Sequence, residues 1–263
     1  MQVTRSMRTR CLDQSLLALV LALLSVAVYA RDVIDITSKG EASTRTLYFE
    51  VPNPKATVLL FIGGDGQLKL NDDGQTSSRH TFVRSIERWA SHGINAVLVD
   101  SLSDLGNAKK GHKRNSEDHL NRVSEVISFY QQTQGKPVWI FGHSMGTSTV
   151  AALMNSGRPE VSQLSGYIVA GTLAGESIPP SIKLPALGIH HERDGCPKTP
   201  VGASKVIIDS RSEDTVKGLV LLTGGQERGN PCFAQSYHGF LGIEDEFIDS
   251  AAKFILQNSR LPE

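Results

Sequence analysis

The stretch KPVWIFGHSMGTSTVAALM, residues 136–154, contains the pattern that decides the fold. It opens with an apolar run typical of a buried strand and closes with the small and apolar residues of a helix. Between them, Ser144 lies two positions after Gly142 and two before Gly146, the pattern G-x-S-x-G. Such a tight turn holds the serine in strained backbone geometry, and side chains at the two glycine positions would collide with their neighbours. We therefore expect the Ser144 hydroxyl at the edge of a sheet, beside a helix N-terminus that favours negative charge.

The composition is that of an ordinary globular protein. Of the 263 residues, 40% are hydrophobic and 21% are charged, which suits one large core. The formal net charge is +0 at pH 7, whereas a nucleic-acid-binding domain usually carries a basic excess, so we expect no nucleic-acid partner. The sequence has no evident repeat, low-complexity tract or linker, and residues 31–263 are therefore predicted to form a single domain.

Residues 1–30 have the parts of a secretory signal peptide. Arginines precede an apolar run at residues 16–28, and Val28 and Ala30 occupy the −3 and −1 positions of a cleavage site. We predict cleavage after Ala30 and export to the periplasm or the medium. The alternative is an uncleaved membrane anchor, which would need an apolar run of about 20 residues. This run is shorter, so we expect no stable membrane insertion after cleavage.

Apolar and amphipathic segments alternate along the rest of the chain. Strands are expected at residues 32–38, 44–51, 56–62, 94–99, 136–140, 166–170, 184–190 and 218–222. Helices are expected at residues 76–92, 116–134, 147–154, 201–208 and 243–256. This alternation predicts an α/β fold with a doubly wound, mostly parallel central sheet and helices on both faces. Residues 171–183 are too few for a separate cap domain.

With these features the chain resembles the α/β-hydrolase family. The resemblance rests on the turn around Ser144, on the order of strands and helices, and on an acid and a histidine that follow the serine in that order. Asp194 follows the strand that ends at His190, and His238 lies between the last strand and the last helix. The resemblance covers essentially the whole mature chain.

The resemblance implies a catalytic triad of Ser144, Asp194 and His238. His238 would take the hydroxyl proton and return it to the leaving group, while Asp194 would fix the imidazole tautomer and stabilise its cation. Other acids follow the same strand, and Asp194 is favoured by its place directly after it. These alternative acids are Glu192, Asp209 and Asp214. The plainer alternatives are a turn serine at 144 and a surface histidine at 238.

The resemblance also implies an oxyanion hole with two amide donors. The amide of Met145, directly after the serine, would be the first donor. The second would come from the glycine loop after residues 56–62, at Gly64 or Asp65. The family often has His-Gly where this chain has glycines 63 and 64, which leaves the second donor open between these two residues.

Two cysteines, Cys196 and Cys232, remain once the leader is removed. In an exported chain such a pair suggests one disulfide, and two buried free thiols are the alternative. Cys196 closely follows Asp194, and Cys232 closely precedes His238. A bridge would therefore tie the acid loop to the histidine loop, which must meet if Asp194 is to orient His238.

Other polar clusters favour plainer interpretations. Residues 190–194 contain two histidines and two acids, but adjacent strand residues point to opposite faces, so we expect no metal site there. The acidic residues at 65–73 lack the twelve-residue spacing of a calcium loop and are interpreted as a turn. The basic run at 109–114 is interpreted as a solvated loop, with contact to an anionic substrate or surface as the alternative.

Together these observations predict an exported serine hydrolase that cleaves a small-molecule or polymer ester through an acyl-enzyme. The expected chemistry requires no cofactor and no metal. An amidase or an acyltransferase with the same residues is the alternative enzyme, because pocket shape sets the leaving group and the acceptor. A binding protein that has lost catalysis on a hydrolase fold is the alternative from another class. Acyl length and oligomeric state do not follow from the sequence.

Overall fold

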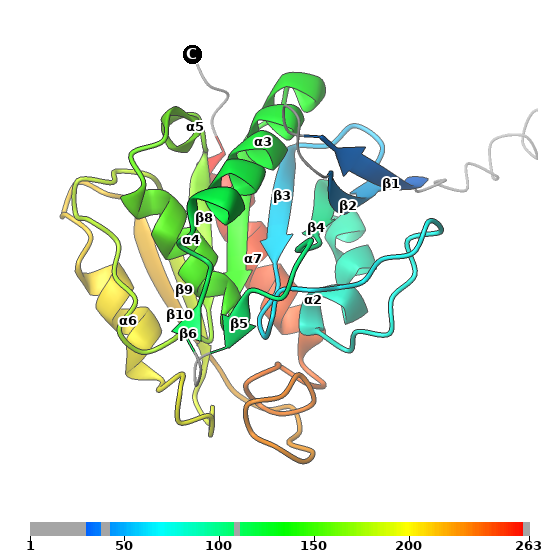
Figure 1. The fold of residues 1–263 in the computed structure, drawn as a ribbon. Helices are drawn as coiled ribbons and strands as arrows, with labels where there is room; N and C mark the ends of the chain where they lie inside the picture. Colours follow the sequence, from blue (N-terminus) through cyan, green and yellow to red (C-terminus); the bar gives the residue numbers. More distant parts are fainter. Residues whose placement is uncertain (1–29, 38–42, 108–110, 260–263) are drawn as a thin grey trace, which may run out of the picture.

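One sheet of eight strands forms the centre of the molecule (Figure 1). The structure is a computed structural model that describes residues 30–37, 43–107 and 111–259. The strands follow the spatial order β1-β2-β4-β3-β7-β8-β9-β10. They are β1 (Ala30–Ile36), β2 (Thr44–Glu50), β3 (Ala56–Phe61), β4 (Ile94–Val99), β7 (Val138–His143), β8 (Gly166–Ala170), β9 (Ala186–His191) and β10 (Lys217–Leu222).

Most of this sheet is parallel. β1 pairs with β2, and β2 with β4, in antiparallel fashion, whereas every other neighbouring pair is parallel. β3, β4, β7, β8 and β9 are buried along their whole length, which explains their continuous apolar sequences. Because parallel strands end at the same edge of a sheet, the loops that follow β3, β7 and β9 meet there, at the bottom of Figure 1.

Helices cover both faces of the sheet (Figure 1). They are α2 (Thr81–Arg84), the 3₁₀ helix η1 (Ile86–His92), α3 (Glu117–Gln134), α4 (Gly146–Asn155), α5 (Pro159–Ser162), α6 (Gly202–Asp209) and α7 (Glu244–Asn258). The core has two layers, one on each face of the sheet, and the side chains of β7 alternate between them. Phe141 packs on Phe247 of α7 and Trp139 on Phe254 of the same helix, whereas Ile140 belongs to the other cluster, which includes Val126 of α3. The predicted doubly wound α/β fold is therefore confirmed.

The helix predicted at residues 76–92 is wrong in its first part. Residues 76–80 are not helical, α2 starts at Thr81, and η1 follows with 3₁₀ geometry. Local side-chain bonds replace the first turn, because the Thr76 hydroxyl accepts from the amide of Ser78 (3.0 Å) and Ser78 accepts from His80 (3.3 Å). His80 is the N-cap of α2, and its side chain accepts from the amide of Phe82.

The structure also bears on the loop predicted at residues 101–115 and on the predicted signal peptide. The segment predicted as a loop at 101–115 contains a short hairpin, β5 (Gly106–Asn107) and β6 (Gly111–His112). The predicted signal peptide lies outside the described residues except for Ala30, which begins β1. Within the part of the chain that the structure describes, no helix has the length and apolar character needed to span a membrane.

Candidate active site

Ser144 occupies the turn between β7 and α4, and its φ of 56° lies in the left-handed region that favours glycine. Its two glycines are needed for close approach of backbone atoms. A Cβ at Gly142 would lie 2.4 Å from the carbonyl oxygen of Gly146, and one at Gly146 would lie 2.0 Å from that of Phe61. The amide of Ser144 donates to the carbonyl of Ala170 on β8 (2.9 Å), which fixes the turn against the neighbouring strand.

His238 and Asp194 meet at the same edge of the sheet. His238 Nδ1 lies 2.8 Å from Asp194 Oδ2, and since a carboxylate only accepts, Nδ1 carries the proton and Nε2 holds a lone pair. Nε2 is buried and has no hydrogen-bond partner among the described residues. His238 and Ser144 line one cavity of about 260 Å³. The histidine and the serine therefore line the same cavity.

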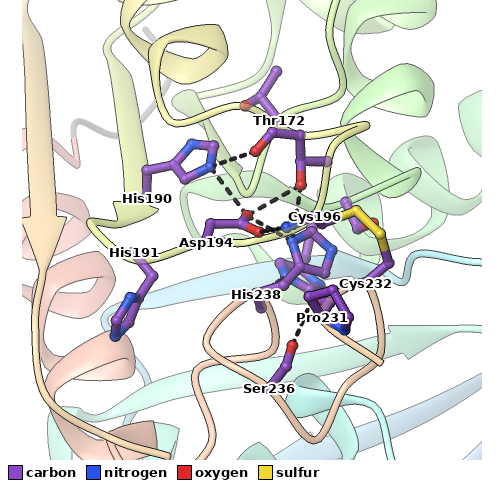
Figure 2. Close-up of polar contacts among 12 residues, drawn as sticks. Thr172, His190, His191, Asp194, Cys196, Pro231, Cys232, Ser236 and His238 are labelled. Carbon is purple, nitrogen blue, oxygen red and sulfur yellow. Dashed lines mark hydrogen bonds and ion pairs between the residues drawn. A yellow bond between two sulfur atoms is a disulfide. The ribbon is translucent and has the colours of Figure 1, made fainter. Parts of the chain in front are cut away.

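Asp194 is almost completely buried, with 1% of its side chain exposed, and receives several donors (Figure 2). Besides His238, its Oδ2 lies 3.1 Å from His190 Nε2 and 3.1 Å from the hydroxyl of Thr199. Its Oδ1 accepts from the amide of Cys196 (2.9 Å). Burial by itself would raise the pKa of Asp194, but the hydrogen bonds from His190 and His238 outweigh it and hold the pKa well below its usual range. Asp194 is therefore a carboxylate at neutral pH.

The glycine loop after β3 packs directly against the serine. A Cβ at Gly63 would lie 2.8 Å from the Cβ of Ser144 and 3.2 Å from its Oγ. The amide of Gly63 donates to His80 Nε2 (3.2 Å) and so already has a hydrogen-bond partner. The amides of Gly64 and Asp65 have no hydrogen-bond partner among the described residues, and neither has that of Met145. These three amides are the ones expected for the oxyanion hole, and the choice between Gly64 and Asp65 stays open.

Solved structures with a similar fold provide a comparison for this arrangement. No protein-family model and no curated protein sequence matches the chain. A dienelactone hydrolase from Anabaena variabilis is similar with a TM-score of 0.60 at 17% identity, over 88% of this chain and 99% of that one. A serine hydrolase without lid from Xanthomonas campestris has a TM-score of 0.54 at 13% identity, over 85% and 94%. The chain has the α/β-hydrolase fold.

A cold-adapted esterase from an Arctic intertidal metagenomic library shares the fold at a TM-score of 0.56 and 12% identity, over 88% of this chain and 94% of that one. At these identities the likeness establishes the α/β-hydrolase fold alone. It covers 94–99% of each of these structures and 85–88% of this chain.

Arg114 holds the glycine loop of this α/β-hydrolase fold in place. The expectation that the whole basic run is solvated is wrong here, because the Arg114 residue is only 1% exposed. Its Nη2 donates to the carbonyls of Ile62 and Gly64 (both 3.1 Å), and its Nη1 donates to the Thr149 hydroxyl of α4 (2.9 Å). Burial lowers the pKa of Arg114 to about 10, so it remains a cation at neutral pH. Lys109 and Lys110 lie outside the described residues.

Two buried histidines connect the glycine loop to the histidine loop. His143 Nε2 donates to the carbonyl of His238 (2.8 Å), and His143 Nδ1 lies 3.0 Å from His80 Nε2. Burial lowers the pKa of His143 to about 3, and that of His80 well below its usual value. Both rings are therefore neutral, and the amides of Phe82 and Gly63 lie 3.2 Å from His80 Nδ1 and Nε2, respectively. No pattern in the sequence revealed this pair.

The histidine loop is also held by a disulfide and by an arginine. The predicted bridge between Cys196 and Cys232 is present in the structure and spans a sequence separation of 36 (Figure 2). Arg84 of α2 donates to the carbonyls of Ala234 (3.1 Å) and Gly239 (2.9 Å), on either side of His238. Its guanidinium also pairs with Glu244 at the start of α7, at 2.8 Å. These contacts fix both ends of the loop that carries His238.

The two adjacent histidines of β9 point to opposite sides, as expected of a strand. His190 faces Asp194, whereas His191 donates to the carbonyl of Gly224 (3.0 Å) and stacks on Tyr237 at a ring distance of 4.6 Å. Among the described residues, no group of three or more histidines, cysteines and acids is arranged to hold a metal ion. The sequence singled out His190 as part of a possible metal cluster and missed its contact with the predicted catalytic acid.

Proposed function

We propose that this protein is a serine hydrolase that cleaves carboxylic esters through an acyl-enzyme at Ser144. The observation that carries the proposal is the state of His238. Its Nδ1 donates to the buried carboxylate of Asp194, while its Nε2 is unpartnered among the described residues and belongs to a side chain that shares a cavity with Ser144. A base with this tautomer next to a serine in a strained turn is the arrangement that acyl transfer requires.

In the proposed reaction, His238 Nε2 takes the Ser144 proton as Oγ attacks the ester carbonyl carbon. The amide of Met145, together with that of Gly64 or Asp65, donates to the oxyanion of the tetrahedral intermediate. The His238 cation, stabilised by Asp194, then gives its proton to the leaving alcohol as the carbon–oxygen bond breaks. Water repeats the cycle on the acyl-enzyme, which releases the acid and restores the Ser144 hydroxyl.

The substrate is proposed to be a small-molecule or polymer ester. Proteins of the same fold include a dienelactone hydrolase and an esterase, both of which act on carboxylic ester bonds according to their names, and this supports the ester class. The predicted leader, together with a disulfide, supports export as part of the proposal, because disulfides persist in oxidising compartments.

The test is hydrolysis of p-nitrophenyl esters of increasing acyl length by the mature chain, with Ser144→Ala as the control. We expect turnover by the wild type and a loss of at least ~10³-fold in the variant. A fluorophosphonate probe should label the wild type at Ser144 and leave the variant unlabelled. Absence of turnover on every ester, or equal turnover by Ser144→Ala, would contradict the proposal, and activity confined to amides would favour an amidase.

A further inference from the structure

Asp194 lies between two histidines, and only one of them belongs to the proposed triad (Figure 2). Oδ2 of the carboxylate is 2.8 Å from His238 Nδ1 and 3.1 Å from His190 Nε2. The side chain of His190 is completely buried, with 0% exposed. It is not among the residues that line the cavity of Ser144. His190 can therefore influence the reaction only through the groups that it contacts.

The hydrogen bonds around His190 define where its proton is. Its Nε2 faces two acceptors, Asp194 Oδ2 and the carbonyl of Thr199, both at 3.1 Å, so Nε2 must carry a proton. Its Nδ1 lies 2.8 Å from the hydroxyl of Ser204, which in turn lies 2.7 Å from the hydroxyl of Thr172. In neutral His190 the Nδ1 lone pair accepts from Ser204, and Ser204 accepts from Thr172. The chain of donors thus runs from Thr172 toward the carboxylate.

Building on the proposed function, we propose that His190 is a positioning residue for the reaction. It acts through Asp194, because its Nε2 proton fixes the carboxylate and draws part of the negative charge of Oδ2 away from His238. The same oxygen also accepts from the Thr199 hydroxyl, so three donors share one carboxylate oxygen. A carboxylate oxygen whose charge is spread in this way stabilises an imidazolium less than an oxygen that has His238 as its only donor.

The proposal predicts the direction in which loss of His190 changes the pKa of His238. Removal of the His190 donor concentrates negative charge on Oδ2, which favours the cationic form of His238 and raises its pKa. The base form of His238 would then be lost at a higher pH, so the acid limb of the pH–activity profile would move upward. The carboxylate would also lose an orienting contact, which lowers kcat, whereas KM should change little because His190 does not line the cavity.

Other ionisable groups around His238 and Asp194 must be considered. His143 of β7 has its ring 4.9 Å from that of His238, and burial lowers its pKa to about 3, so it stays neutral over the relevant range. Burial likewise lowers the pKa of His191, which faces the other side of β9. Arg84 of α2 holds the histidine loop through the carbonyls of Ala234 and Gly239. Further groups nearby are Glu192 and Arg193 on the loop of Asp194, Glu227, whose carboxylate lies close to Gly195, and His80, whose pKa burial lowers well below its usual value. All of them are left unchanged in the variants below.

Asparagine and glutamine at position 190 distinguish the roles of the two ring nitrogens of His190, because each replaces a different one. The amide of Gln reaches the place of Nε2 and can still donate to Asp194, whereas the shorter Asn reaches only the place of Nδ1 and Ser204. His190→Gln and His190→Asn are thus a matched pair with similar polarity. His191→Asn is the control for position, because that residue is also buried on the same strand and its imidazole does not hydrogen-bond to the Asp194 carboxylate.

The experiment measures the pKa of His238 by NMR titration of its imidazole protons, which needs no substrate. We expect His190→Asn to raise this pKa by about 0.5–1 unit, and His190→Gln and His191→Asn to leave it within ~0.2 unit. In ester hydrolysis, His190→Asn should lower kcat about tenfold with KM within ~2-fold, and His190→Gln should restore most of the loss. If His190→Asn does not fold, Ser204→Ala, which removes the donor to Nδ1, should give a smaller shift of the same sign.

An unchanged pKa of His238 in the folded variants, or equal effects of Asn and Gln, would overturn the positioning role. Failure of the proposed function would look different. In that case the wild type would neither turn over esters nor react with the fluorophosphonate probe, while the NMR titration would still report whether His190 acts on His238 through Asp194.

Discussion

The guanidinium of Arg114 donates to the carbonyl oxygen of Gly64 at 3.1 Å, which couples a buried cation to the loop proposed to supply an oxyanion donor. A second bond to the carbonyl of Ile62 and a third to Thr149 complete the arrangement. The carbonyls on this loop are thus held on the side of Arg114, and the amides of Gly64 and Asp65 have no partner among the described residues.

Replacement of Arg114 by lysine should lower kcat about tenfold or more, with a smaller change in KM. A lysine ammonium cannot reach three acceptors with the planar fork of arginine, so the glycine loop loses its fixed geometry. Steady-state ester hydrolysis measures this effect. Lys113→Ala is the matched control, because this neighbouring cation is exposed, and equal losses in both variants would contradict the role given to Arg114.

Reduction of the bridge between Cys196 and Cys232 should lower both stability and activity. The disulfide ties the loop of Asp194 to the loop of His238, and chain-entropy arithmetic for this separation of 36 residues gives roughly 3–4 kcal/mol, a model-dependent value. Thermal unfolding and ester hydrolysis with and without reductant measure both effects. The double variant Cys196→Ser/Cys232→Ser should behave like the reduced protein and be insensitive to reductant. Two reactive thiols in the native mature chain would rule the bridge out.

Stability should fall as the pH is lowered from 7 to 5, in part because of His119. This side chain packs against Thr149, and burial lowers its pKa in the folded state to about 3. The unfolded chain takes up the proton near pH 6.5, so acidification stabilises only the unfolded state. The contribution of neutral His119 to the stability of the folded state is therefore complete only above that pH. Between pH 7 and 5, His119→Gln should lose about 2 kcal/mol less free energy of unfolding than the wild type. Urea titrations at the two pH values test this, and equal losses would show that folding does not lower the pKa of His119.

Phe233, at the cavity of Ser144, should affect which esters the protein binds best. Phe233 lines the cavity of Ser144 and is 65% exposed, so its ring can cover an apolar part of a substrate. Phe233→Ala should raise KM about fivefold for long-chain p-nitrophenyl esters, equivalent to about 1 kcal/mol of lost apolar contact, and leave the KM of p-nitrophenyl acetate unchanged. Val206→Ala is the control, because Val206 is 62% exposed on α6 and does not line this cavity. Equal KM values for all esters would show that Phe233 does not contact the substrate.

Much of this fold could be predicted because local patterns determine it. The strands β3, β4, β7 and β8 are continuous apolar runs, and the glycines around Ser144 are required by contacts with backbone atoms that no side chain could replace. The pairing of Cys196 with Cys232 was predicted because these two cysteines remain once the leader is removed, and the meeting of Asp194 with His238 was implied by the resemblance to the α/β-hydrolase family.

The missed features depend on tertiary contacts between distant residues. Arg114 looks like a surface cation in the sequence, and only the carbonyls of the distant glycine loop make its burial favourable. His80 was expected inside a helix, but it caps α2 and faces His143, which is 63 residues away. His190 could be placed on the correct side of its strand by alternation, yet its partner Asp194 lies in a loop whose path has no periodic signal.

The left-handed backbone of Ser144 has a consequence for directed evolution. A glycine at this position would adopt the same φ of 56° without the steric penalty of roughly 1–2 kcal/mol that a Cβ incurs there. A library selected for heat resistance alone would therefore be enriched in the residue that lacks the nucleophile. Only a screen that requires turnover in every round would retain the serine. The difference in free energy of unfolding between the glycine variant and the serine protein would measure how much folding stability this protein gives up for its proposed chemistry.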